Sequence, residues 1–270
     1  MRAMEYHIIS GRAIETRRSY MSGRPKKQRG MRRAGTSSVK KIACNERDTV
    51  KALTRLLHCN FWKGFLFVTL KYSNDRLPKS YEEAQKVQER FLRKLRGEAK
   101  KTGMDKLRYI AVTANWSKHD CPARLHHHMV LPPEVSLDTL RRIWPEGEIY
   151  IETVSNPGNL SGLAVYLLRN VHGLEPGKKK YSPAKGMDKP VYTEPKAVDE
   201  VEGVQALPGT YVVAAENTKD EDGRVVGSYI MAMAQEPPKV RGSMVILPKK
   251  PKRKESWNDE YMAGIRRADD

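Results

Sequence analysis

The order of apolar segments between residues 65 and 171 constrains the fold of this chain more than any other feature. Short runs rich in branched residues, which predict strands, alternate there with patterns of helical period. The order is strand, helix, strand, strand, helix, strand, helix. It predicts an α+β domain built on an antiparallel sheet of about five strands, with helices packed on one face. The strands are expected at residues 65–70, 107–113, 124–131 and 148–154, and the helices at 80–101, 137–144 and 160–171.

The segments on either side of this region have a different character. Residues 1–45 are basic and show little periodicity, so we expect a flexible, disordered arm. A helix is predicted over residues 46–60 and opens a domain that we place at residues 46–192. Residues 193–270 are expected to form an accessory β-hairpin followed by a flexible basic tail.

The net charge of +18 indicates a polyanionic partner because the basic residues are clustered. Residues 1–45 carry twelve Lys and Arg against two acids, Glu5 and Glu15. A second basic run covers residues 248–254. Such clusters neutralise the phosphates of nucleic acids whatever the base sequence. Binding to a membrane surface would need an amphipathic apolar face, which neither run has.

Neither a membrane span nor a disulfide framework is expected. The chain has no window of about 18 apolar residues, and its N-terminus lacks the apolar segment of a secretion signal. The cysteines are Cys44, Cys59 and Cys121. Their odd number and the lack of a CxxC pair argue against disulfides and a structural zinc site. These features predict a cytoplasmic protein without a membrane partner.

The run RLHHHMVL at residues 124–131 is the most informative for chemistry. On a strand, His126 and His128 point to one face and His127 to the other, because successive side chains alternate. The two imidazoles therefore converge, and imidazole is the commonest metal ligand among protein side chains. A chance cluster of histidines is the alternative.

Tyr166, in the run LAVYLLRN, is a candidate nucleophile in the middle of a predicted helix. Arg169 follows three residues later on the same side of that helix. Taken alone, a tyrosine in an apolar helix is more often a core residue. Thr69, inside the first apolar strand, is likewise unremarkable by itself.

Together, the Thr69 strand, the His-x-His strand and the Tyr166 helix occur in an order and spacing that resemble the HUH endonucleases. The resemblance is to the rolling-circle replication initiators of phages and plasmids. The segment KKKYSPAKGMDKP, residues 178–190, resembles the string that follows the tyrosine helix in many phage-type members. The resemblance covers residues 65–190 and implies a ferredoxin- or RRM-like palm and a nicking function for the domain at residues 46–192.

The resemblance implies that Tyr166 attacks a phosphodiester and forms a 5′-phosphotyrosine link that initiates rolling-circle replication. His126 and His128 would hold a divalent metal, Mg²⁺ or Mn²⁺, that polarises the scissile phosphate. His127, which faces away, is not carried over as a ligand. Arg169 would contact the phosphate or the tyrosine oxygen.

The implied partner is single-stranded or hairpin DNA at a replication origin. Lys71 and Arg124 are candidates for contacts with the DNA backbone. The host replication machinery is a further candidate partner.

One departure from the family pattern concerns the third metal ligand. Members commonly have an acid at the end of the strand before the histidines, where this chain has Ala114. Nearby candidates for the ligand are Asn115, His119, Asp120 and Cys121. Two alternatives therefore stay open beside replication initiation: a related HUH transposase or relaxase, and a non-catalytic basic DNA-binding protein.

Overall fold

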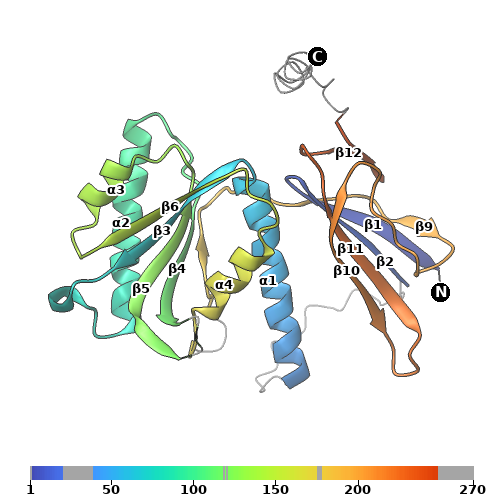
Figure 1. Cartoon of the computed structure of the whole chain (residues 1–270), viewed down its shortest axis with the longest axis horizontal. Coiled ribbons are helices and arrows are strands. Elements are labelled where there is room, and N and C mark those ends of the chain that lie inside the picture. Colours follow the sequence, from blue (N-terminus) through green and yellow to red (C-terminus); the bar gives the residue numbers. More distant parts are fainter. Residues whose placement is uncertain (1, 21–38, 118, 120, 175–177, 249–270) are drawn as a thin grey trace, which may run out of the picture.

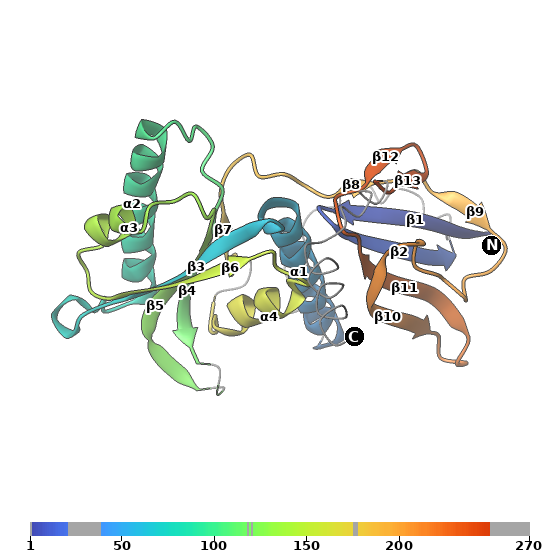
Figure 2. The ribbon, with the colours of Figure 1, turned by 45° about the horizontal axis from the view of Figure 1, so that its top comes forward.

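The computed structural model describes residues 2–20, 39–117, 119, 121–174 and 178–248. Two antiparallel sheets lie on opposite sides of helix α1 (Val39–Phe61), as Figures 1 and 2 show. The first sheet contains the histidine strand and is the one expected from the sequence. The second sheet joins strands from the two ends of the described chain.

The first sheet has five strands in the order β6-β3-β5-β4-β7. The expected α+β fold on an antiparallel sheet is confirmed. Helices cover both faces rather than one: α2 and α3 lie on one face, and α4, backed by α1, lies on the other (Figure 2). The elements are β3 (Gly64–Lys71), α2 (Tyr81–Lys101), β4 (Ile110–Trp116), β5 (Pro122–Leu131), α3 (Leu137–Ile143), β6 (Ile149–Ser155), α4 (Ser161–Arg169) and β7 (Ser182–Pro183).

The second layer of helix follows from the composition of the central strands. Strand β3 reads GFLFVTLK, a nearly continuous apolar run, and such a strand is buried on both faces. Leu66 and Val68 face α2, while Phe65 packs edge-on against Phe61 of α1, with ring centroids 6.4 Å apart. A single layer of helices would leave one of these faces in water.

Helix α2 begins where its capping residues predict. The Ser80 hydroxyl accepts a hydrogen bond from the Glu83 backbone N–H at 3.2 Å. The Glu83 carboxylate in turn accepts one from the Lys79 N–H at 2.8 Å. These bonds satisfy donors that the first helical turn leaves without a partner, so the helix starts at a defined residue.

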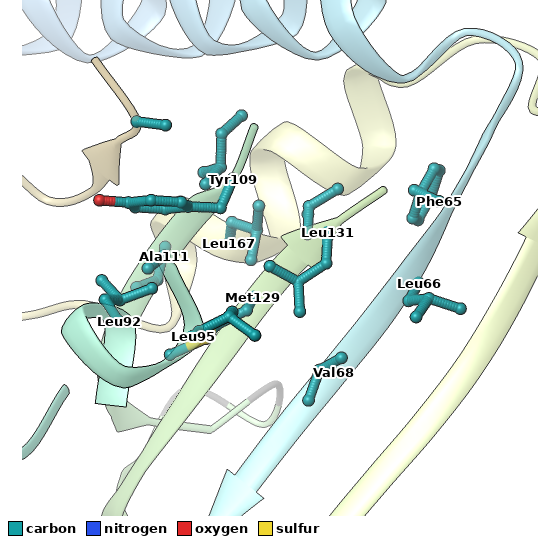
Figure 3. Close-up of a cluster of buried hydrophobic side chains, with 14 of the residues drawn as sticks. Phe65, Leu66, Val68, Leu92, Leu95, Tyr109, Ala111, Met129, Leu131 and Leu167 are labelled. Carbon is teal, nitrogen blue, oxygen red and sulfur yellow. The ribbon is translucent and has the colours of Figure 1, made fainter. Parts of the chain in front are cut away.

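The main core lies between α2 and the first sheet. Figure 3 shows Leu92 and Leu95 of α2 beside Met129 and Ala111 of the sheet, with Val68 next to them. Met129 pairs with both Val68 and Ala111, so these residues share one face. The packing fixes β5 from one side and leaves the alternate residues of β5 for the opposite face.

The predicted disorder of residues 1–45 is wrong for its described parts. Residues 3–20 form a hairpin of β1 (Ala3–Ser10) and β2 (Ala13–Tyr20), and α1 already begins at Val39. The remainder of the predicted arm, residues 21–38, lies outside the described residues, as do residues 249–270 at the end of the predicted basic tail.

Two features conceal the hairpin in the sequence. Its arginines look like a solvated basic run, but Arg18 is hydrogen-bonded to Glu5 at 2.6 Å and Arg17 to Glu15 at 3.1 Å. The turn depends on Gly11, which has φ +56° and lies so close to the carbonyl oxygen of His58 that a side chain would clash with it.

The predicted C-terminal hairpin, residues 211–216 and 224–234, is confirmed as β10 (Tyr211–Lys219) and β11 (Val225–Met233). It is not a separate accessory unit, because β11 pairs along β2 from Ala13 to Ser19. The sheet order is β10-β11-β2-β1-β8, and β9 also pairs with β1. The remaining short strands are β8 (Val191–Tyr192), β9 (Lys196–Val198), β12 (Lys239–Arg241) and β13 (Met244–Ile246).

An ion pair links the second sheet to α1. The Arg55 guanidinium of α1 donates to both carboxylate oxygens of Glu15 on β2, at 2.5 and 2.7 Å. Glu15 is only 4% exposed. A bidentate pair of this kind fixes orientation as well as distance, so it sets how the sheet sits on the helix.

The segment at residues 178–190 has a structural role. Ser182 and Pro183 form β7, which pairs with Ala111 and Ile110 of β4, and the next residue, Ala184, donates its N–H to the Tyr109 carbonyl at 2.9 Å. The segment thus adds the last strand of the first sheet beside β4.

Candidate active site

The strand register places the predicted metal ligands on one face of the first sheet. His126 lies opposite Lys71 of β3 and Ala114 of β4. His128 lies opposite Thr69 of β3 and Val112 of β4. Residues directly opposite each other in an antiparallel sheet share a face, so the two histidines and Thr69 face the side covered by α4.

The two imidazoles approach each other closely. His126 Nε2 and His128 Nε2 are 3.0 Å apart. His126 Nδ1 donates to the Arg124 carbonyl oxygen at 2.8 Å, which leaves the lone pair of its neutral ring on Nε2. His128 Nδ1 is 3.0 Å from the Thr69 hydroxyl. Hydrogen bonds to the far ring nitrogen are the usual way in which metal-binding histidines are oriented.

Burial keeps both rings neutral. The pKa of His126 is lowered by desolvation, and Lys71 lowers it further. The pKa of His128 is lowered to about 3, mainly by desolvation and also by His126. Neutral imidazole is the form that binds metal ions.

The donor pair fits a divalent ion. Metal–nitrogen bonds of about 2.1 Å at right angles to each other would separate two ligand atoms by about 3 Å. The Nε2–Nε2 distance of 3.0 Å matches this separation. Two facing lone pairs would repel each other without a proton or a cation between them, so His126 and His128 would hold the metal here.

His127 points to the opposite face, as predicted. It is fully buried against α2, where its Nε2 is 2.5 Å from the Tyr72 hydroxyl and its Nδ1 accepts from the Gln88 side-chain amide at 3.1 Å. Burial lowers the pKa of His127 to about 3. This histidine therefore anchors β5 in the core, and its neighbours project from a fixed strand.

Tyr166 projects from α4 over the histidine pair. Its hydroxyl lies 3.3 Å from His128 Nε2, and its ring meets the Phe67 ring edge-on at 6.0 Å. The residue is 37% exposed, which distinguishes it from an ordinary core tyrosine. Partial burial raises the pKa of Tyr166, so the phenol is protonated at neutral pH.

A cavity of about 840 Å³ opens onto the histidines and Tyr166. Both predicted DNA-contacting residues, Lys71 and Arg124, line it. The Arg124 guanidinium is held by Asn74 Oδ1 at 2.6 Å and by the Tyr72 carbonyl at 3.0 Å. The cavity therefore combines two cations with the imidazole pair.

Arg169 does not line this cavity. It lines a neighbouring cavity of about 710 Å³ between α1, α4 and residues 178–183. One turn of α4 separates it from Tyr166. The structure thus places Arg169 beside the histidine cavity rather than in it.

Position 114 faces the histidine pair, as the departure from the family pattern requires. Ala114 is buried and lies directly opposite His126. Among the described residues, no group of three or more His, Cys, Asp and Glu side chains is arranged to hold a metal.

The expected third-ligand candidates lie elsewhere. Asn115 exchanges two hydrogen bonds with the His172 backbone, at 2.9 and 3.0 Å. Cys121 Sγ is 3.0 Å from the Ser117 hydroxyl, and the His119 backbone N–H donates to that same hydroxyl at 3.2 Å. None of these three residues lines the histidine cavity. Asp120 lies outside the described residues.

Sequence reasoning missed two cavity residues, Glu148 and Tyr150. Both line the cavity, and the Tyr150 hydroxyl donates to Glu148 at 2.6 Å. The alternation EIYIETV already assigned Tyr150 to the polar face of its strand. The pairing of β6 with β3, which brings that face to the histidines, was needed to place it.

Comparison with known proteins gives one family match. The model of a family described as "Replication-associated protein" matches residues 65–170. This stretch runs from the first residues of β3 to the end of α4, so it contains the histidine pair and Tyr166. The match supports a replication initiator with DNA as its partner.

Neither the curated proteins nor the solved structures gave a significant match. Among the described residues, no helix is both long enough and apolar enough to span a membrane.

Proposed function

We propose that this protein nicks and rejoins one strand of DNA through a 5′-phosphotyrosine intermediate, and so initiates rolling-circle replication. One observation carries the proposal: the Tyr166 hydroxyl lies 3.3 Å from an imidazole nitrogen that itself faces a second imidazole nitrogen at 3.0 Å. A nucleophile and a metal-binding pair on one open cavity are the parts that phosphodiester transfer requires.

The chemistry begins at the Tyr166 hydroxyl. Its oxygen forms a bond to phosphorus as the bond from phosphorus to the 3′ oxygen breaks, and the phenolic proton passes to water. The products are a 5′-phosphotyrosine and a free 3′-OH. The reverse attack by a 3′-OH rejoins the strand without ATP, because one phosphodiester replaces another.

The protein contributes position and charge. Phe67 holds the Tyr166 ring from below, and α4 fixes its direction. Lys71 and Arg124 line the same cavity and are placed to bind the phosphates of the strand. Arg169, on the next turn of α4, would bind a phosphate adjacent to the one attacked.

His126 and His128 are the residues that would hold a divalent ion, Mg²⁺ or Mn²⁺. When bound, the ion would polarise the scissile phosphate and stabilise the charge that develops on it. Two nitrogen donors favour Mn²⁺ in affinity, whereas Mg²⁺ prefers oxygen ligands.

The substrate is single-stranded or hairpin DNA at an origin. The match to a replication-associated family favours replication initiation over a transposase or relaxase role for the same chemistry. The host replication machinery would then extend the free 3′-OH, and the reaction would take place in the cytoplasm.

A non-catalytic DNA-binding protein is the second candidate, and Ala114 favours it. The position opposite His126 carries no carboxylate, and loss of an acid there weakens a metal site. A non-catalytic protein would bind DNA in a salt-dependent way without any need for a divalent metal.

The deciding experiment uses single-stranded oligonucleotides tiled across the replicon, incubated with the full chain and Mn²⁺. We expect a covalent protein–DNA adduct on a denaturing gel that disappears with EDTA and in the Tyr166→Phe variant. The Tyr181→Phe variant is the matched control, since Tyr181 lines the neighbouring cavity instead. Tight binding of every tile with no adduct on any of them would refute nicking and support the second candidate.

A further inference from the structure

We propose that Glu148 supplies the carboxylate of the divalent-metal site, in place of the acid that is missing at position 114. The proposal rests on the metal-dependent function put forward above. Three observations carry it: the strand register, the composition of the cavity and the partners of the Glu148 side chain.

The register aligns Glu148 with the histidines. Lys71 pairs with His126, which pairs with Ala114. On the other side of Lys71, its backbone N–H donates to the Glu148 carbonyl at 2.9 Å, which continues the pairing of Leu70 with Ile149 by one residue. Glu148 and Ala114 therefore occupy the two ends of one row across the sheet, on the face that carries His126.

Glu148 also shares the cavity of the histidines. It is the one acidic residue among the described residues that line this cavity. The other charged residues there are Lys71 and Arg124. A dication held by two neutral imidazoles beside two cations would lack any compensating negative charge without Glu148. Mg²⁺ and Mn²⁺ also take oxygen donors more readily than nitrogen.

The side chain of Glu148 is held in the cavity and is not neutralised there. Its carboxylate accepts the Tyr150 hydroxyl at 2.6 Å. The Lys71 ammonium lies over the Tyr150 ring, 4.3 Å from its centroid. Among the described residues, no basic group is within ion-pair distance of Glu148. The negative charge of Glu148 therefore remains available to a cation in the cavity.

Metal affinity tests the proposal without DNA. Mn²⁺ is titrated into the full chain and followed by electron paramagnetic resonance, which distinguishes free from bound Mn²⁺. A His126→Ala/His128→Ala variant identifies the binding that belongs to the pair. We expect Glu148→Gln to weaken that binding about 10–100-fold, the usual effect of removing a supporting group from a metal site.

Three further variants separate the explanations. Glu152→Gln removes an exposed carboxylate on the same face of β6 and should leave the affinity unchanged. Tyr150→Phe tests whether Glu148 acts only through its hydrogen bond to Tyr150, and it should also leave the affinity unchanged. Ala114→Glu combined with Glu148→Gln should restore binding, because the acid returns at the other end of the row.

Wild-type affinity in Glu148→Gln would overturn the proposal, as would an equal loss in Tyr150→Phe, a folded double variant that shows no recovery, or a wild type that binds no Mn²⁺ at the histidine pair. These outcomes are separate from a failure of nicking. A wild type that binds Mn²⁺ through Glu148 and forms no adduct with DNA would refute the nicking function and leave the metal site intact.

Discussion

His58 makes folding stability depend on pH in a way that can be isolated. The residue lies on α1, is 1% exposed, and its Nε2 accepts the Leu160 backbone N–H at 3.2 Å. Leu160 is the residue before α4, the helix that carries Tyr166. This hydrogen bond requires a neutral ring, so protonation of His58 breaks the link between α1 and the start of α4.

The magnitude follows from the pKa of His58, which is lowered from 6.5 to about 4, mainly by burial, with Arg12 contributing. A histidine with a lowered pKa in the folded state adds stability above pH 6.5. That stability is lost as the pH falls toward 4, because the unfolded chain binds the proton first. A shift of about 2.5 units at about 1.4 kcal/mol per unit gives a loss of about 3 kcal/mol.

Urea denaturation of the wild type and a His58→Gln variant measures this loss. Glutamine keeps a hydrogen-bond acceptor and does not titrate. The other histidines titrate in both proteins, so they cancel in the difference between the two free energies of unfolding. That difference should fall by about 3 kcal/mol between pH 7 and pH 4, with EDTA present throughout. A difference that stays constant over this range, or that grows, would refute the reasoning.

Three further predictions concern the two sheets. Leu95→Ala, in the core beneath β5, should lower the free energy of unfolding by about 2–5 kcal/mol in urea denaturation, and a loss below about 1 kcal/mol would show that the α2 interface is loosely packed. Glu15→Gln should cost about 3–5 kcal/mol, because Arg55 then remains buried without its partner; equal stability of the two proteins by calorimetry would contradict the buried pair. Gly11→Ala should destabilise the protein by more than about 1 kcal/mol, since it combines a positive φ with a clash at His58; an unchanged melting temperature would show that the turn can move.

The first sheet could be predicted because its signals are local. Ser80 and Glu83 mark the start of α2 within four residues of each other. The apolar runs of β3 and β5 are short and bounded by polar residues. The spacing of His126 and His128 gives their common face directly, since strand side chains alternate.

The remaining features depend on contacts between distant segments. The side chain of Arg18 looks solvated until Glu5 and the carbonyl of Glu202 are placed beside it. Glu148 belongs to the metal cavity only through the pairing of β6 with β3. Periodicity reports which face a side chain takes, but not which strand lies next to it.

The pairing of β2 with β11 has a consequence for biosynthesis. The first sheet is complete once residue 183 has been made, whereas β2 waits for its second neighbour until residue 233. The β1–β2 hairpin therefore emerges from the ribosome before the first sheet and finishes assembly after it, with an open strand edge in the interval. A chain that stops before β11 would expose this edge along β2, and it would aggregate even though its histidines, Tyr166 and first sheet were intact.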